Sequence, residues 1–277
     1  MIERVGVCSW SLRQNRVEGL VQSLKEIDIR TLQVAILPLT EDREQIDQLE
    51  HAIEMGQVEL CSGMMQTLGE DYTSLESIRQ TGGLRPDKHW EANLRHAESC
   101  AEIGARLGLG LVTLHAGFLP YDNPVQLARI VDRICQVAQV FEAKGITLGL
   151  ETGQERAETL LELLSTISTR AQVRVNFDPA NMILYDMGDP IEALKALSEF
   201  IVQVHLKDAI RTKKTGQWGD EVAAGSGEVD WDSFFELVEG FVQPLDIVIE
   251  REAGDQRIED IRLASKLAST QIARVRS

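Results

Sequence analysis

The stretch FIVQVHLKDAIR (200–211) begins like a protein interior and ends like a reaction centre. Four of its first five residues are apolar, which is typical of a buried strand. His205, Lys207 and Asp208 follow at once, and Arg211 stands three residues further on. A buried strand that runs directly into four ionisable side chains indicates a functional site at the strand end. The fold is predicted from the other strand-like runs along the chain.

Short apolar runs of this kind recur along the whole chain. Their length and their content of Val, Ile and Thr predict strands, and Gly56, Gly108 and Gly145, at predicted helix ends, each stand just before one. The predicted strands are VGVCSW (5–10), TLQVAIL (31–37), QVELCSG (57–63), GLVTLHAG (110–117), ITLGLETG (146–153), VRVNFDPA (173–180), IVQVHLKD (201–208) and DIVIEREAG (246–254).

Longer segments between these runs show apolar residues at spacings of three and four, the pattern of an amphipathic helix. Pro190 is compatible with a first helical position, and Asp230 is suited to an N-cap. The predicted helices cover residues 41–55, 89–108, 125–145, 156–167, 190–200, 230–241 and 256–275.

Eight strand–helix repeats in 277 residues, without a linker, predict an α/β protein made of one (β/α)₈ TIM barrel. The strands would be parallel, and residues 1–277 would form one domain. A doubly wound open sheet would instead need a Gly-rich turn after the first strand, and CSWSLRQN (8–15) has none. Two longer excursions, 64–88 and 209–229, follow strands and therefore lie on the C-terminal face, where barrels build active sites.

The composition argues against several classes of partner. The formal charge is −16, from 44 acidic and 28 basic residues, and such a field repels nucleic acid. The sequence has no apolar run of about 18 residues, so we expect no membrane span. MIERVGVCSW (1–10) enters a strand pattern at once, which leaves no room for a signal peptide. We therefore expect a cytoplasmic protein.

The last four barrel strands end in groups that can bind a metal ion, namely Glu151, Asp178, His205 and Glu250. The first three stand 27 residues apart, one strand–helix unit each, so all four side chains would meet at one mouth. Three carboxylates packed together repel one another unless protons or a cation neutralise them. Three oxygen ligands and one imidazole suit Mn²⁺, Mg²⁺, Co²⁺ or Zn²⁺. The alternative is a structural ion-pair network.

The late strand ends also carry longer motifs. Taken together, these motifs resemble the xylose-isomerase-like TIM-barrel superfamily of sugar isomerases and epimerases. The resemblance covers the whole chain in architecture and mainly residues 110 to 254 in motifs. The motifs are LETG (150–153), NFDPAN (176–181), HLKDAIR (205–211), GSGEVDW (225–231) and VIERE (248–252).

The resemblance implies roles for these residues. One divalent metal ion would be bound by Glu151, Asp178, His205 and Glu250, and the two glutamates would also be the catalytic acid/base pair. Arg211 would contact substrate oxygens. Many ketose epimerases of the family carry a substrate-binding His three residues after the strand-six Asp, where this chain has an Asn, and that departure leaves the substrate open.

Four more residues at strand ends are candidate substrate contacts. Asn181, at the departing position, can still hydrogen-bond a hydroxyl group. His115 and Lys207 are expected to point into the barrel mouth, where His115 would bind substrate or a metal-bound water, or would otherwise be structural. Trp10 could form a wall against the apolar face of a sugar, or could belong to the core. Lys207 could equally be held in a structural salt bridge.

The excursion at 209–231 is Gly-rich, basic at its start and carries Trp218. We interpret it as a lid that covers a sugar and excludes water. Gly225 and Gly227, just before the helix at Asp230, form a short Gly-x-Gly that could alternatively hold a phosphate.

The function that the resemblance implies is a metal-dependent isomerase or epimerase of a sugar or sugar phosphate. One glutamate would remove a proton next to a carbonyl, the metal would stabilise the enediolate, and the other glutamate would return a proton. An alternative is a metal-dependent dehydratase of a cyclic polyol ketone, like inosose dehydratase, which shares the enolising step. Homo-oligomers are common in the superfamily, so we expect that this protein could form one.

Two further classes fit less well. Abasic-site endonucleases share the barrel but need several metals held by many His, and this chain has five His. A non-catalytic sugar-binding barrel would be expected to lose one of the paired glutamates, and Glu151 and Glu250 are both present. Both observations favour an enzyme that acts on a small sugar.

Overall fold

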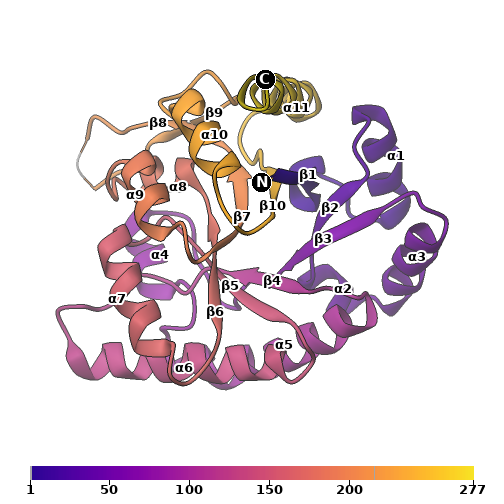
Figure 1. The fold of residues 1–277 in the computed structure, drawn as a ribbon. Helices are drawn as coiled ribbons and strands as arrows, with labels where there is room; N and C mark the ends of the chain where they lie inside the picture. Colours follow the sequence, from indigo (N-terminus) through magenta and orange to yellow (C-terminus); the bar gives the residue numbers. More distant parts are fainter. Residues whose placement is uncertain (1, 215) are drawn as a thin grey trace.

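The computed structural model describes residues 2–214 and 216–277, whose centre is a closed barrel of eight parallel strands (Figure 1). Around the barrel the order is β1-β10-β7-β6-β5-β4-β3-β2, so β1 closes the ring against β2 and β10. The predicted (β/α)₈ barrel is confirmed. The eight predicted strands form as β1 (Ile2–Cys8), β2 (Thr31–Ala35), β3 (Glu59–Met64), β4 (Leu111–Leu114), β5 (Thr147–Glu151), β6 (Val173–Phe177), β7 (Ile201–Leu206) and β10 (Leu245–Ile249).

Helices surround the barrel (Figure 1). Each predicted helix forms with both ends within three residues of the predicted bounds. A further helix of 11 residues, α1 (Val17–Ile27), was not predicted and follows β1. The predicted helices are α3 (Arg43–Glu54), α5 (Asp87–Arg106), α6 (Pro124–Glu142), α7 (Ala157–Ile167), α9 (Pro190–Leu197), α10 (Trp231–Glu239) and α11 (Arg257–Val275).

Side-chain caps fix where several of these helices begin. The carboxylates of Asp42, Asp189 and Asp230, and the amide oxygen of Asn123, accept backbone N–H groups of α3, α9, α10 and α6 respectively. These bonds satisfy N–H groups that a helix leaves without partners at its start. The predicted cap at Asp230 is confirmed.

Four short elements were not predicted, and all lie in connections after strands. The 3₁₀ turn η1 (Ser9–Leu12), α2 (Leu37–Glu41), α4 (Leu75–Thr81) and α8 (Pro179–Leu184) add turns at the C-terminal face. In α4 the capping box pairs Ser74 with Ser77 rather than with Glu or Gln, so the usual sequence signal is absent.

Strand β7 shows how the barrel is filled. The side chains of Gln203 and His205 bond to residues of strands on the opposite wall, Ser62 in β3 and Gln33 in β2, so both point inward. Because side chains alternate along a strand, Val204 points outward to the helices. Val204 is fully buried in the hydrophobic core. The strand is thus apolar outside and polar inside.

The excursion at 209–229 contains regular structure that the sequence did not predict. β8 (Asp208–Ile210) pairs antiparallel with β9 (Asp220–Val222). This hairpin stands apart from the barrel strands, beside α8 and α10 (Figure 1).

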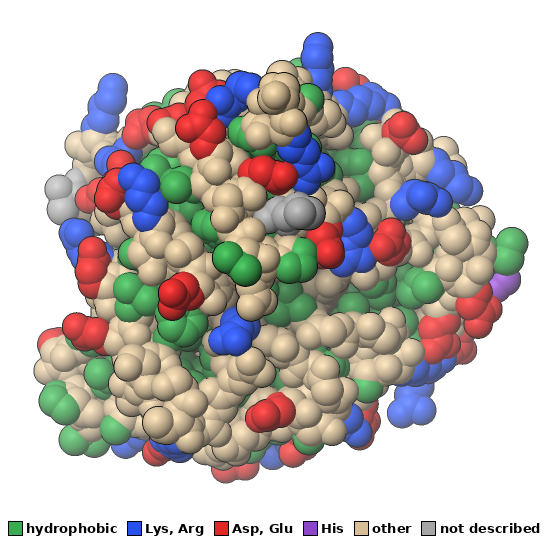
Figure 2. Space-filling model, viewed as in Figure 1, with side chains coloured by type: hydrophobic (Ala, Val, Ile, Leu, Met, Phe, Trp, Pro, Cys, Tyr) green, Lys and Arg blue, Asp and Glu red, His purple; other side chains and the backbone are tan. Residues whose placement is uncertain are grey.

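On the face shown in Figure 2, Lys and Arg side chains are interspersed with Asp and Glu. Among the described residues, none of the helices is both long and apolar enough to cross a membrane.

Candidate metal centre and active site

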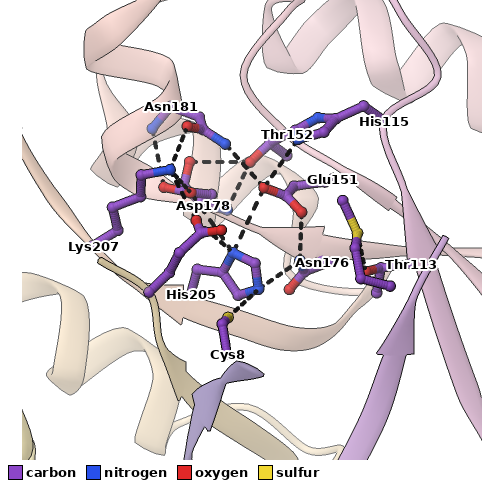
Figure 3. Close-up of polar contacts among 12 residues, drawn as sticks. Cys8, Thr113, His115, Glu151, Thr152, Asn176, Asp178, Asn181, His205 and Lys207 are labelled. Atoms are coloured by element: carbon purple, nitrogen blue, oxygen red, sulfur yellow. Dashed lines mark hydrogen bonds and ion pairs between the residues drawn. The ribbon is translucent and has the colours of Figure 1, made fainter. Parts of the chain in front are cut away.

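The structure brings the four predicted metal ligands together at the C-terminal mouth of the barrel. Glu151 ends β5, Asp178 follows β6, His205 lies in β7 and Glu250 follows β10. Each is at most 5% exposed, and each offers one ligand atom that lies within 4.8 Å of the others. Figure 3 shows His205 between the carboxylates. Their assignment as metal ligands stays a prediction.

The Nδ1 atom of His205 lies at the centre of this cluster. It is 3.2 Å from Glu250 Oε2, 3.6 Å from Glu151 Oε1 and 3.7 Å from Asp178 Oδ2. Burial alone would lower the pKa of His205, but Glu151 and Glu250 raise it well above its ordinary value. The position of Nδ1 therefore stabilises a positive charge, whether a proton or a metal ion.

The other ring nitrogen of His205 is held by Gln33. His205 Nε2 lies 2.8 Å from Gln33 Oε1, an atom that only accepts hydrogen bonds, so Nε2 donates. The Gln33 amide nitrogen donates to Thr113 Oγ1 at 2.9 Å, and that hydroxyl donates to Met64 Sδ at 3.1 Å, which fixes the amide orientation. Because Nε2 carries a hydrogen, the lone pair of Nδ1 is available to a cation.

Glu250 is held as a carboxylate by two donors. Trp10 Nε1 donates to its Oε1 at 2.7 Å, and Lys207 Nζ donates to its Oε2 at 2.9 Å. Burial would raise the pKa of Glu250, but Lys207 and His205 outweigh burial and hold the pKa well below its usual range.

Glu151 has a different set of partners. Asn181 Nδ2 donates to Oε1 at 3.0 Å and Asn176 Nδ2 donates to Oε2 at 3.1 Å, while His115 Nε2 lies 3.4 Å from Oε1. Burial would raise the pKa of Glu151, but His115 and His205 lower it below its ordinary value. Both glutamates are therefore ionised.

The two carboxylate oxygens of Asp178 have different surroundings: one caps a helix and the other faces the cluster. Oδ1 caps α8 by accepting the backbone N–H of Asn181 at 3.0 Å. Oδ2 is buried, and the described residues provide it with no hydrogen-bond donor. Its neighbouring cationic groups are His205 Nδ1 at 3.7 Å and Lys207 Nζ at 3.8 Å. Burial, only partly offset by Lys207, raises the pKa of Asp178 to about 6.

The residues fit a divalent cation. Asp178 Oδ2 and His205 Nδ1 are buried polar atoms without a hydrogen-bond partner among the described residues, and such atoms are rare in the absence of water or an ion. Carboxylate oxygens with one imidazole suit Mn²⁺, Mg²⁺, Co²⁺ or Zn²⁺.

A cavity of about 420 Å³ opens onto this cluster. Trp10, His115, Asn181, Lys207 and Glu250, all predicted site residues, line it. This placement fits their predicted contact with substrate, which stays a prediction. The lining residues that the sequence did not point to include Glu70, Tyr72, Tyr185 and Glu252.

Arg211 does not line the cavity. Its guanidinium donates to Asp186 Oδ1 at 2.5 Å and to the carbonyl oxygen of Gly188 at 3.2 Å. Trp218 of the same excursion packs edge-on against Tyr185 of the cavity wall, with ring centroids 6.4 Å apart. The substrate contact of Arg211 and the lid function of this excursion stay predictions.

The Gly-x-Gly of the excursion is occupied by a side chain of the protein. The carboxylate of Asp208 accepts five N–H groups, and we call this arrangement the Asp208 clasp. A Cβ on Gly227 would lie 2.1 Å from Asp208 Oδ1, so only glycine fits there. The backbone donors that could have held a phosphate are therefore already used. The five donors are the backbone N–H groups of Ala209, Gly225, Gly227 and Val229 and the indole Nε1 of Trp231, at 2.8 to 3.2 Å.

Beneath the cluster lies a buried polar layer that the sequence analysis missed. Ser62 donates to Gln203, Gln203 donates to Asn176, and Asn176 donates to Glu151. Asn176 stands two residues before Asp178, and Gln203 two before His205, so they share the inward parity of the site residues. Polar residues at that parity were the signal that could have found this layer.

Solved structures with this architecture are numerous. A xylose isomerase domain protein from Planctomyces limnophilus is 27% identical, with a TM-score of 0.82 over 92% of each chain. The structure of an L-ribulose 3-epimerase is 15% identical, with a TM-score of 0.74 over 100% of this chain and 96% of its own. The IOLI protein, solved with a zinc atom, is 15% identical, with a TM-score of 0.76 over 99% of both chains.

Sequence comparison points the same way. Protein YihM of Escherichia coli (strain K12) is 32% identical over 104 residues, a match that spans 37% of this chain and about a third of YihM. The family description "Xylose isomerase-like TIM barrel" matches residues 21–268. With the closed barrel and the clustered strand-end residues, that match establishes that the chain belongs to the xylose isomerase-like TIM barrel family.

Proposed function

We propose that the protein is a divalent-metal-dependent isomerase or epimerase that moves a proton next to the carbonyl of a small sugar. One observation carries the proposal. Two glutamates, Glu151 and Glu250, are held ionised beside the same imidazole and come from strands on opposite sides of β7. Two carboxylates that approach one carbon from different sides are what inversion of a stereocentre requires.

The metal ion would be held by Glu151, Asp178, His205 and Glu250. When bound there, it would act as a Lewis acid that stabilises the negative charge developing on a carbonyl oxygen. The zinc atom of the IOLI protein supports a metal in a barrel of this fold. Mn²⁺, Mg²⁺, Co²⁺ and Zn²⁺ are the candidate ions.

The glutamates would carry the proton. One accepts the α-proton of the substrate as general base, and the electron pair of the broken C–H bond forms the enediolate. The other glutamate, ionised in the empty site, would first take up a proton from solvent water and then return it to the same carbon in epimerisation. In an aldose–ketose isomerisation the proton returns to the neighbouring carbon. The L-ribulose 3-epimerase structure supports the first of these outcomes in a barrel of this fold.

Other residues of the cavity would position these groups. Trp10 and Lys207 orient Glu250 through hydrogen bonds to its two oxygens. Asn181 links the two halves, because it donates to Glu151 and accepts from Lys207 at 3.3 Å. His115 lies beside Glu151 and lines the cavity, so it is available to a substrate hydroxyl.

The test begins with chelator-stripped protein titrated with Mn²⁺ by calorimetry. Wild type should bind one ion per chain, and Glu250→Gln should weaken binding by at least about 100-fold, because it removes a charged ligand. Ketoses and ketose phosphates are then incubated with the loaded enzyme in heavy water, and deuterium uptake next to the carbonyl is followed by NMR.

The outcomes separate the candidate functions. Deuterium uptake without loss of water supports the isomerase or epimerase. A conjugated product that absorbs in the ultraviolet would identify the dehydratase alternative instead. Failure of wild type to bind any of the four ions at millimolar concentration would contradict the proposal, and the cluster would then be a structural ion-pair network.

A further inference from the structure

The charges that line the cavity are predominantly negative. Glu70, Glu250 and Glu252 line it, and Lys207 is the one Lys or Arg among the described lining residues. Lys207 is not available to a ligand, because its ammonium donates to Glu250 and Glu252, each at 2.9 Å, and to Asn181 at 3.3 Å. Its three hydrogens are therefore all used within the protein.

The guanidinium groups around the mouth are also engaged. Arg211 is bonded to Asp186 and Gly188. Arg251, which follows Glu250, donates to Asp260 and Glu221 at 2.8 Å each. Neither lines the cavity. A phosphate in the cavity would therefore have no unoccupied lysine or arginine among the lining residues that the structure describes.

The Asp208 clasp also occupies the Gly-x-Gly that the sequence suggested as a phosphate site. Backbone N–H groups of a Gly-rich loop can cradle a phosphate. Here Gly225 and Gly227 donate theirs to Asp208, at 2.8 and 3.0 Å. A phosphate would have to displace a buried carboxylate that holds five N–H donors.

From these contacts we infer that the substrate is an uncharged polyhydroxy ketone or aldehyde, without a phosphate or carboxylate group. This inference rests on the proposed function and narrows it. The carboxylates of Glu70 and Glu252 accept O–H groups from a neutral sugar, whereas they repel a phosphate dianion. The rings of Trp10 and Tyr185, both in the cavity wall, offer apolar surface to the carbon skeleton.

The test compares each neutral ketose with its own phosphate ester on the Mn²⁺-loaded full chain. The pairs are D-fructose with its 6-phosphate, D-ribulose with its 5-phosphate and D-xylulose with its 5-phosphate. Deuterium uptake next to the carbonyl gives kcat/KM for each compound. We expect the neutral member of the best pair to be favoured by at least about tenfold, because like charges across the cavity oppose the ester.

Two variants test whether the cavity carboxylates cause the preference for the neutral sugar over its phosphate ester. Glu70→Gln and Glu252→Gln should each raise kcat/KM for the ester relative to the neutral sugar, the second more because it also removes one of the negative charges paired with Lys207. Glu192→Gln removes a charge from the surface of α9, where the Glu192 carboxylate bonds to Lys195, and should leave the ratio unchanged.

Each outcome has a defined meaning. Preference for an ester would overturn the inference and leave the proposed function standing. An unchanged ratio in both cavity variants would also overturn it, because the discrimination would not arise from these carboxylates. Uptake from neither member of any pair would contradict the proposed function and, with it, the inference.

Discussion

Two buried aspartates at neighbouring strand ends, Asp178 and Asp208, have opposite surroundings. Both are at most 1% exposed. Asp208 accepts five N–H donors, three of them on Oδ2. Asp178 accepts one backbone N–H on Oδ1, and its Oδ2 has no hydrogen-bond donor among the described residues. A carboxylate with all its lone pairs satisfied holds structure, whereas one with a bare buried oxygen keeps a lone pair that a cation can use.

The comparison also explains the motif HLKD. His205 and Lys207 point into the cluster. Asp208 points the other way and accepts N–H groups from the segment GSGEVDW (225–231), which ends the excursion. The same four residues thus provide the charged floor of the cavity and the anchor of the hairpin beside it. The two functions can be separated by mutation.

The largest effect is expected for Asp178→Asn. Asn keeps the N-cap of α8, because its side-chain oxygen can still accept the N–H of Asn181. The variant should bind Mn²⁺ about 1,000-fold more weakly, equal to about 4 kcal/mol. Calorimetric titration measures this. Without metal the variant should be at least as stable as wild type, because a buried carboxylate whose Oδ2 has no donor among the described residues has been replaced by a neutral amide.

Unchanged metal affinity in Asp178→Asn would contradict this assignment of Asp178. Asp189→Ala is the control for a change at an aspartate N-cap outside the cluster, since Asp189 caps α9 on the exposed surface. It should lower stability by about 1 kcal/mol and leave Mn²⁺ binding as in wild type.

Asp208→Asn should show the reverse pattern. Its amide offers one oxygen where the carboxylate offers two, and its NH₂ group faces N–H donors, so charge-assisted bonds are lost. We expect a loss of about 3 kcal/mol in the free energy of unfolding, measured by denaturant titration. Mn²⁺ affinity should change by less than about threefold, because Asp208 is no part of the cluster. A variant as stable as wild type would show that the clasp is dispensable.

The sequence predicted the barrel because its strands are short, apolar and evenly repeated, and a local pattern is enough to recognise them. It predicted the cluster because Glu151, Asp178 and His205 stand one strand–helix unit apart. Parallel strands carry such positions to one face whatever the details of packing.

The sequence could not predict which side chains on other strands would hydrogen-bond to the site residues across the barrel. Gln33 meets His205 from 172 positions away in the chain, and Trp10 meets Glu250 from 240. Such contacts depend on the register and tilt of the closed barrel rather than on any local pattern. The pairing of Arg211 with Asp186 depends in the same way on how the hairpin lies against α8.

Gln33→Leu tests whether the cluster needs the hydrogen bond on the far side of the imidazole. Loss of the acceptor of His205 Nε2 frees the ring to adopt the other tautomer, and we expect Mn²⁺ affinity to fall by about 10- to 100-fold. Cys8→Ala is the control, because Cys8 Sγ donates to the same Gln33 oxygen at 3.5 Å and lies 3.9 Å from His205 Nε2, while its removal leaves the bond between Gln33 and His205 in place. A loss of equal size in both variants would indicate a general disturbance of the barrel interior.

The smallest expected effect is the rise in Tm on Mn²⁺ binding, which can be compared between the Asp178 and Asp208 variants. Mn²⁺ at about ten times its Kd should stabilise the native state by about 1.4 kcal/mol, because it binds the folded cluster and not the unfolded chain. For a chain of this size that raises Tm by about 3 to 5 °C. The shift should persist in Asp208→Asn, which starts from a lower Tm, and should vanish in Asp178→Asn at the same Mn²⁺ concentration. If the Mn²⁺-induced rise in Tm were lost in both variants, the cation site would depend on the Asp208 clasp. The conclusion that the two aspartates have separate roles would then be wrong.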